Sequence, residues 1–192
     1  MMRGDRIGFM ANESLAPVLL VSMPQMLDAN FSKAVVLLAE YNAQGAFGLV
    51  LNRRMEEPAE AIVTADEPLE IHPSMYLYTG GPVEPTRAWI LTAKPELDIE
   101  ALELTQGVYL SASPSLVRKT LESAPDPGVR MVVGYSGWGA GQLDIELAQG
   151  SWLMAPVQPD LMFETSSDKM WETAIRRMGA EPSMLHGSSG VH

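Results

Sequence analysis

Two short and almost uninterrupted apolar runs lie close together in the first third of the chain. The runs are VVLLAE at residues 35–40 and FGLVL at residues 47–51, and the segment between them contains Asn42 and Gly45. Apolar runs of this length on either side of Asn and Gly are typical of a β-hairpin. Because the runs hardly alternate with polar residues, both faces of these strands must be covered. The stretch therefore predicts a hairpin inside a sheet that is buried on both sides.

The remaining apolar runs predict a sheet that is accompanied by helices. Helices are expected at residues 56–66, at 142–149 and after Ser113, which precedes Pro114 in a typical helix start. Further strands are expected at residues 16–23, 75–81, 86–93, 107–113, 129–136 and 151–157, with a solvated edge strand or a loop at 96–100. Hairpins and helices do not follow a strict strand–helix alternation, so the pattern favours an α+β fold.

The clearest helix lies near the C-terminus. Its apolar residues recur at helical spacing on one face; they are Met170, Trp171, Ala174, Ile175 and Met178. Trp171 and its neighbours are expected in the core, although Met162, Phe163, Met170 and Trp171 could instead form a protein-contact surface. The polar, glycine-rich residues after Pro182 predict a disordered tail at 181–192, which leaves a single domain at residues 1–180.

A glycine-rich turn follows a predicted strand in VVGYSGWGAGQLDIEL, residues 132–147. It is not a phosphate-binding P-loop, because Gln142 and Leu143 follow its last glycine where Lys and Ser or Thr are needed. Asp144 likewise occupies the place of the third glycine of a dinucleotide-binding motif. Ser136 does not fit a hydrolase nucleophile, because Trp138 replaces the glycine that the nucleophile elbow requires. The glycines are then expected to serve close packing, and Trp138 to plug the core.

Charge and composition narrow the classes of partner. The 192 residues contain 13 basic and 24 acidic side chains, a net charge of −11, which opposes direct binding to nucleic acid. No cysteine is present, which removes disulfides and zinc–cysteine sites and fits a cytoplasmic protein. The sequence indicates no metal site, no cofactor and no apolar run long enough for a membrane span. A signal peptide at the start is disfavoured by Asn12, Glu13 and Pro17.

Polar and glycine residues stand where several of the predicted strands end. Strand ends of one sheet can meet at one rim, where clefts form. We therefore expect one cleft, with Arg53 beside Glu146; its residues would be Asn52, Arg53, Gly80, Gly81, Ser136, Trp138, Gly139, Gln142 and Glu146. The opposite expectation is that these blocks lie at different rims and each serves its own turn. No catalytic residue is assigned among them.

Six segments together resemble the AlgH/YqgE family of bacterial proteins. They are SMPQMLDANFSKAVVLL, GLVLNR, YTGGPV, GYSGWGAGQLDIEL, WLMAP and the LMF…W of the last helix, in the order of the family. The family usually has Ala in place of Ser136 and often Pro in place of Ala140. The resemblance implies a mixed, mostly antiparallel sheet that is partly closed into a barrel and surrounded by helices. It also implies a bacterial cytosolic protein and carries a transcriptional-regulator label, but no catalytic residues.

The sequence and the resemblance lead to one functional expectation and one alternative. We expect a non-enzymatic regulatory or protein-binding factor with an unknown protein partner, because no complete catalytic set accompanies the specific segments. The alternative is a small-molecule-binding protein or hydrolase that uses the cleft around the loop at residues 134–142.

Overall fold

A computed structural model describes residues 14–185 of the chain. Its strands form one curved sheet with the order β6-β7-β5-β8-β3-β2-β1-β9, to which β4 is added beside β8. The strands are β1 (Val18–Ser22), β2 (Val35–Asn42), β3 (Gly45–Val50), β4 (Tyr78–Thr79), β5 (Val83–Thr92), β6 (Leu102–Thr105), β7 (Val108–Ser111), β8 (Val129–Gly139) and β9 (Trp152–Ala155). Only the β4–β8 pair is parallel among these strands. The expected α+β fold with a mostly antiparallel sheet is thus confirmed.

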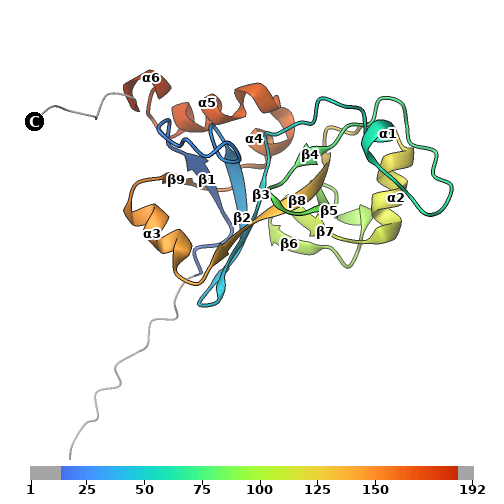
Figure 1. Ribbon diagram of the computed structural model, residues 1–192, viewed down its shortest axis with the longest axis horizontal. Coiled ribbons are helices and arrows are strands. Elements are labelled where there is room, and N and C mark those ends of the chain that lie inside the picture. Colours follow the sequence, from blue (N-terminus) through green and yellow to red (C-terminus); the bar gives the residue numbers. More distant parts are fainter. Residues whose placement is uncertain (1–13, 186–192) are drawn as a thin grey trace, which may run out of the picture.

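Strand β8 runs diagonally between two halves of a half-open barrel (Figure 1). One half contains β1, β2, β3 and β9 with helices α3 (Gln142–Ala148), α4 (Pro159–Glu164), α5 (Ser167–Arg177) and α6 (Pro182–Leu185). The other contains β4 to β7 with helices α1 (Ala59–Ile62) and α2 (Pro114–Glu122) and the 3-10 turn η1 (Pro95–Leu97). Of the two alternatives for residues 96–100, a solvated edge strand or a loop, the structure has the loop, which begins with η1.

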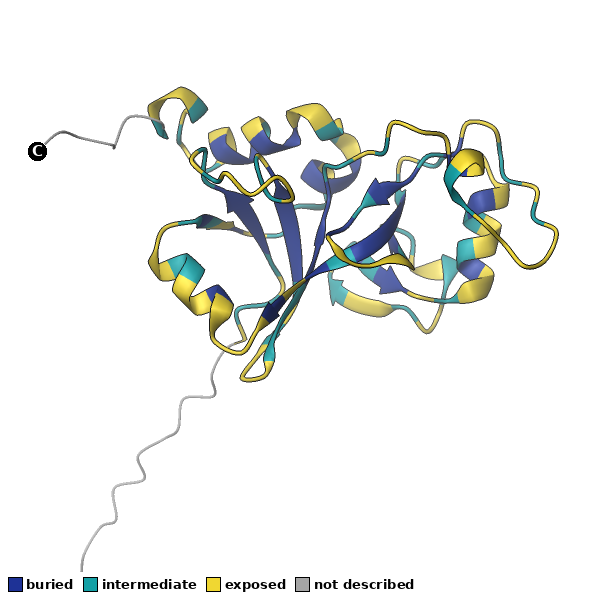
Figure 2. Cartoon of the chain, viewed as in Figure 1, coloured by how far each residue is buried: buried dark blue, intermediate teal, exposed yellow. Residues whose placement is uncertain are grey.

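The hairpin between β2 and β3 is confirmed, and residues 35–38 of β2 and 48–50 of β3 are buried on both faces. Asn42 pairs with Gly45 at the turn. Val35 and Leu37 enter the core under α4 and α5. Val36 and Leu38 enter a second core on the opposite face, which α3 covers. Figure 2 shows the part of these strands away from the turn as buried, whereas the turn end of the hairpin is intermediate or exposed. Because successive side chains point to opposite faces, a run without alternation is what a doubly covered strand requires.

A third core lies in the other half of the molecule, between α2 and the sheet. Leu116 of α2 packs there with Ile90 of β5 and Met131 of β8. The side chain of Ser113 caps α2 as expected, accepting a hydrogen bond from the Leu116 amide at 3.4 Å.

The C-terminal helices also bury the residues for which a contact surface was the alternative. Met162, Phe163 and Trp171 are at most 8% exposed and belong to the first core. Two short elements were not expected from the sequence: α4, and the edge strand β6. A disordered tail was expected from residue 181 onward, but residues 182–185 form α6. Leu185 of this helix is apolar and packs against the first core. The apolar stretch for which a signal peptide was disfavoured contains the buried strand β1. Residues 1–13 and 186–192 lie outside the described residues.

Candidate functional site

One group of the candidate residues forms a closed cluster around the Glu146 carboxylate on α3. Its Oε2 atom accepts hydrogen bonds from the indole nitrogens of Trp138, at 3.0 Å, and Trp152, at 2.8 Å. Its Oε1 atom accepts from the Gln142 side chain at 3.1 Å. Gln142 in turn accepts from the Gly139 amide at 3.0 Å. The start of α3 is thereby tied to the end of β8 by contacts that are all internal to the protein.

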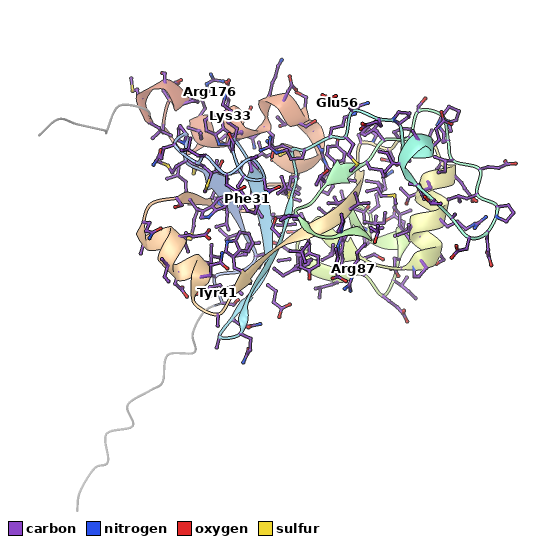
Figure 3. The ribbon with its side chains drawn as sticks, in the orientation of Figure 1. Phe31, Lys33, Tyr41, Glu56, Arg87 and Arg176 are labelled. Atoms are coloured by element: carbon purple, nitrogen blue, oxygen red, sulfur yellow. The ribbon has the colours of Figure 1, made fainter. Side chains whose placement is uncertain are left out.

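Trp138 is a packing residue in this cluster. Its side chain is 5% exposed, and its ring stacks on Phe31 with centroids 6.0 Å apart. Figure 3 labels Phe31 in the half that contains β1, β2 and α3. A Cβ atom at Gly48 would lie 3.4 Å from the Trp138 ring and 2.8 Å from Val36, so a glycine is needed where the ring crosses β3. The glycine-rich turn therefore acts here as a structural turn.

Ser136 is fully buried and is engaged with the Gly80–Gly81 segment. Its hydroxyl donates to the Gly80 carbonyl at 3.0 Å, and the Val50 amide donates to the same oxygen at 2.8 Å. Gly81 has φ +151°, and a Cβ atom there would lie 2.3 Å from the Tyr135 carbonyl. These two glycines let the chain pass between β3 and β8. Ser136 forms no hydrogen bond with a histidine or carboxylate of the described residues, so the arrangement does not activate it as a nucleophile.

Asn52 and Arg53 follow β3 and hold the loop that precedes β2. The Asn52 side chain accepts from the Val35 amide at 2.9 Å and donates to the Lys33 carbonyl at 2.9 Å. Arg53 donates to the Ser32 carbonyl. Within residues 14–185, Arg53 forms no ion pair, so the expected contact with Glu146 is absent.

The register of the sheet explains why the candidate residues divide into two groups. Trp138 pairs with Ala46 near the beginning of β3, whereas Arg53 follows the end of that strand. The loop before β2 links the two ends, since Phe31 packs on Trp138 and its neighbour Ser32 receives Arg53. That a ligand binds among these residues, at either end of β3, stays a prediction.

Three arginines without a carboxylate partner gather at the Arg53 end. Of the arginines between residues 14 and 185, four form ion pairs, and Arg53, Arg54 and Arg130 do not. The Arg54 guanidinium lies 3.8 Å from the ring centroid of Tyr76, and Arg130 lies 4.6 Å from that of Tyr78. The two tyrosine rings meet edge to face at 5.7 Å. We call Arg54, Tyr76, Tyr78 and Arg130 the arginine–tyrosine row.

Arg130 is the most deeply placed of these cations. It is 6% exposed, and its Nη atoms reach the Leu51 and Thr165 carbonyls at 3.5 and 3.3 Å, while Nε has no partner within the described part of the chain. Burial lowers the pKa of both Arg130 and Arg53. Burial also raises the pKa of the Tyr78 hydroxyl, and the nearby Arg130 charge opposes the shift. Neither guanidinium forms an ion pair with a carboxylate of residues 14–185.

Two shallow depressions open beside the arginines. The first has a volume of about 230 Å³ and is lined by Ala29, Asn30, Val50, Arg53, Arg54, Thr79 and Gly81. The second, of about 190 Å³, lies between Asn52, Arg53 and the start of α5, and Lys33, Asp168 and Glu172 are among the residues that line it. The residues that line the first depression include two arginines and no acidic residue, so its chemistry fits an anion.

Sequence reasoning identified Asn52, Arg53 and Gly81 at this end but missed Arg54, Arg130 and the two tyrosines. One signal was available: Arg130 interrupts the otherwise apolar VRMVV strand, where a charge must be buried. The described helices include none long and apolar enough to cross a membrane. Likewise, residues 14–185 contain no group of three or more acidic or histidine side chains placed to hold a metal ion.

Comparison with known proteins places the chain among proteins with this fold. A family model, DUF179, described as AlgH-like, matches residues 19–183. A UPF0301 protein of Anaeromyxobacter dehalogenans is 38% identical over 94% of this chain and 97% of its own length, and one of Cupriavidus pinatubonensis is 34% identical over 89% and 92%. The solution structure of the AlgH protein from Pseudomonas aeruginosa matches with a TM-score of 0.73 at 30% identity and covers 100% of both chains. A crystal structure from Corynebacterium diphtheriae matches with a TM-score of 0.69 at 21% identity over 96% and 94%, which shows the fold alone. The chain therefore belongs to the AlgH-like family.

Proposed function

We propose that this protein is a non-enzymatic, cytoplasmic regulatory factor that binds a protein partner through Arg53 and Arg54. The partner segment would present carboxylates to the depression beside these arginines. The observation that supports the proposal is the gathering of the arginines that lack an ion pair within residues 14–185. The transcriptional-regulator label of the family is compatible with such an indirect role.

The charge balance makes this gathering informative. With 24 acidic against 13 basic residues, a cation on this surface would ordinarily find a carboxylate neighbour. Arg87 and Arg176, in different halves of the molecule (Figure 3), do so through Glu84 and Glu172. Arg53 uses one guanidinium nitrogen for the Ser32 carbonyl, and the Arg54 guanidinium lies over the Tyr76 ring. Their other N–H donors are left for a group from outside, and guanidinium pairs well with carboxylate because both are planar and bidentate.

The small number of basic residues at this end favours a short acidic protein segment over nucleic acid. A net charge of −11 repels every polyanion, and a duplex backbone, with a phosphate at every nucleotide, needs a longer basic track than Arg53 and Arg54 provide. The alternative of a hydrolase at the 134–142 loop lacks an activated nucleophile, since Ser136 is buried and bonded to a carbonyl. His72 lies elsewhere, and its ring accepts the Ser74 amide at 3.2 Å.

A peptide-binding experiment with matched charge variants tests the proposal. Labelled hexaglutamate is titrated into the full chain, and binding is followed by fluorescence anisotropy at about 0.15 M salt. The double variant Arg53→Gln/Arg54→Gln should bind about tenfold more weakly, since two charge-assisted contacts are lost. The control Arg87→Gln/Arg176→Gln changes the net charge equally but removes arginines that are already paired, so it should bind like the parent.

Two outcomes would overturn the proposal. Equal weakening by both double variants, or no measurable binding of hexaglutamate to the parent, would show that the arginines do not form a specific anion site. Tighter, sequence-dependent binding of a DNA duplex at the same salt would show that the partner is nucleic acid instead. Inorganic phosphate is added as a competitor at constant ionic strength. If the arginines recognise the peptide, hexaglutamate should stay bound; if they bind any anion, phosphate should displace it.

A further inference from the structure

A separate cavity lies in the other half of the molecule, between α2 and the start of β8. Its volume is about 130 Å³. Its walls come from the segment before β4, from η1, from α2 and the loop after it, and from β8; they include Met75, Leu97, Leu116, Pro125 and Met131. Figure 1 shows α2 beside this part of the sheet, on the side away from α3. None of the residues expected from the sequence to form a cleft lines this cavity.

The inner wall of the cavity, which we call its floor, is apolar. Met75, Leu116 and Met131 are only 4–5% exposed and belong to the third core. An apolar cavity of about 150 Å³ can stay dry and admit a molecule the size of benzene. Methionine side chains adapt readily to such a guest, and the tyrosines Tyr76 and Tyr78 add an aromatic wall. The floor therefore fits a small apolar body.

The polar groups at the rim determine which polar group the ligand can carry. The Thr120 and Ser123 hydroxyls donate to the helix carbonyls of Leu116 and Lys119, at 2.8 and 2.7 Å, so they are already committed. The Asp126 carboxylate is paired with Lys94. Lys119 is exposed and forms no ion pair with any residue that the structure describes. Its ammonium group is the uncommitted charge at the rim.

We propose that this cavity binds a small monocarboxylic acid. The apolar body, of about six carbon atoms, occupies the space over Met75, Leu116 and Met131, and the carboxylate pairs with Lys119. The inference is independent of the proposed partner site at Arg53 and Arg54, because it rests on different residues. Since Tyr76 and Tyr78 belong both to the cavity wall and to the arginine–tyrosine row, a bound acid would contact the same tyrosines as Arg54 and Arg130.

Titration of the full chain with hexanoate tests this site, with 1-hexanol as the neutral ligand of similar shape. In amide-resolved NMR spectra, hexanoate should shift the signals of α2 and of Met131 saturably, with a Kd on the order of 1 mM. Lys119→Gln should weaken hexanoate binding about tenfold and leave hexanol binding unchanged. Lys169→Gln is the matched control, because Lys169 is exposed on α5, forms no ion pair among the described residues and does not line the cavity.

A second variant separates the cavity from the surface around it. Ala124→Trp places a large ring at the exposed rim and should abolish the binding of both hexanoate and hexanol while the spectrum elsewhere stays that of the folded protein. Hexanoate shifts that do not saturate, that spread over other surfaces, or that are equally weakened by Lys119→Gln and Lys169→Gln would overturn the proposal.

Discussion

Glu146, which is partly buried, and Arg130, which is buried, lie in different parts of the molecule, and their hydrogen-bonding capacity is satisfied very differently. Glu146 accepts three hydrogen bonds of 2.8–3.1 Å from the side chains of Trp138, Trp152 and Gln142. Arg130 is 6% exposed, yet it reaches only two backbone carbonyls at 3.3 and 3.5 Å, stacks over Tyr78 and leaves Nε without a partner in the described structure.

The difference separates a charge that internal hydrogen bonds satisfy from a buried charge whose hydrogen-bonding capacity is only partly used. A carboxylate whose two oxygens already receive three donors has little to offer a ligand, so Glu146 acts as a tie between α3, β8 and β9. Buried charges without good partners are costly and persist where another requirement retains them. Polar residues near glycines at a strand end therefore do not by themselves indicate a binding site. The hydrogen bonds that such residues already form within the protein decide whether their role is structural or whether they can bind a ligand.

The largest expected loss of stability follows from changing a tryptophan that donates to Glu146. Trp138→Ala should lower the free energy of unfolding by about 3–5 kcal/mol, because it leaves a cavity and removes one donor from Glu146. Trp171→Ala should cost a similar amount, since Trp171 is 3% exposed and donates to the Ser22 carbonyl at 2.8 Å. Chemical denaturation measures both. A Trp138→Ala variant with parental stability would mean that the glycine-rich turn does not depend on the cluster.

A smaller loss should follow from changing the carboxylate. Glu146→Leu leaves two indole N–H groups without their acceptor and should cost about 2–4 kcal/mol. Glu146→Gln keeps one acceptor oxygen and should cost less than half as much as Glu146→Leu. If the two variants unfold at the same denaturant concentration, the hydrogen bonds to Glu146 contribute little and the comparison with Arg130 fails.

Replacement of the buried guanidinium should change stability least among the interior variants. Arg130→Met removes a charge without a counter-ion and keeps most of the side-chain volume, so we expect a change within about 1 kcal/mol in either direction. Equilibrium denaturation at neutral pH tests this. A loss as large as that of Glu146→Leu would show that Arg130, too, is a structural tie, and that its long contacts to Leu51 and Thr165 stabilise the fold.

The exposed Lys94–Asp126 ion pair provides a reference for both enclosed charges. Its hydrogen bond from Lys94 lowers the pKa of Asp126, so the pair contributes stability above the ordinary Asp pKa and loses it as the pH falls through the lower folded-state value. Because the Asp126 side chain is 39% exposed, the contribution should be less than about 1 kcal/mol. Denaturation of the parent and of Asp126→Asn should show a small difference at pH 7 that disappears in acid. A difference that grows in acid would contradict this sign.

Features that a segment carries within itself were predictable from the sequence. The unbroken apolar runs and the Asn42–Gly45 turn identified the β2–β3 hairpin and its double coverage. The spacing of Met170, Trp171 and Ile175 identified the buried face of α5, and Ser113 identified the start of α2. The partly closed sheet was expected from the resemblance to the AlgH/YqgE family.

Only the tertiary structure decided which strand ends meet. The sequence left two alternatives for Arg53 and Glu146, one shared rim or different rims, because polar or glycine residues end the apolar run before each of them. The antiparallel pairing of β3 with β8 instead places Trp138 and Glu146 beside the beginning of β3 and Arg53 after its end. Periodicity and turn propensity act over a few residues, whereas these contacts join positions up to about 100 residues apart. Their register is set by how the sheet buries both of its faces, which no single segment specifies.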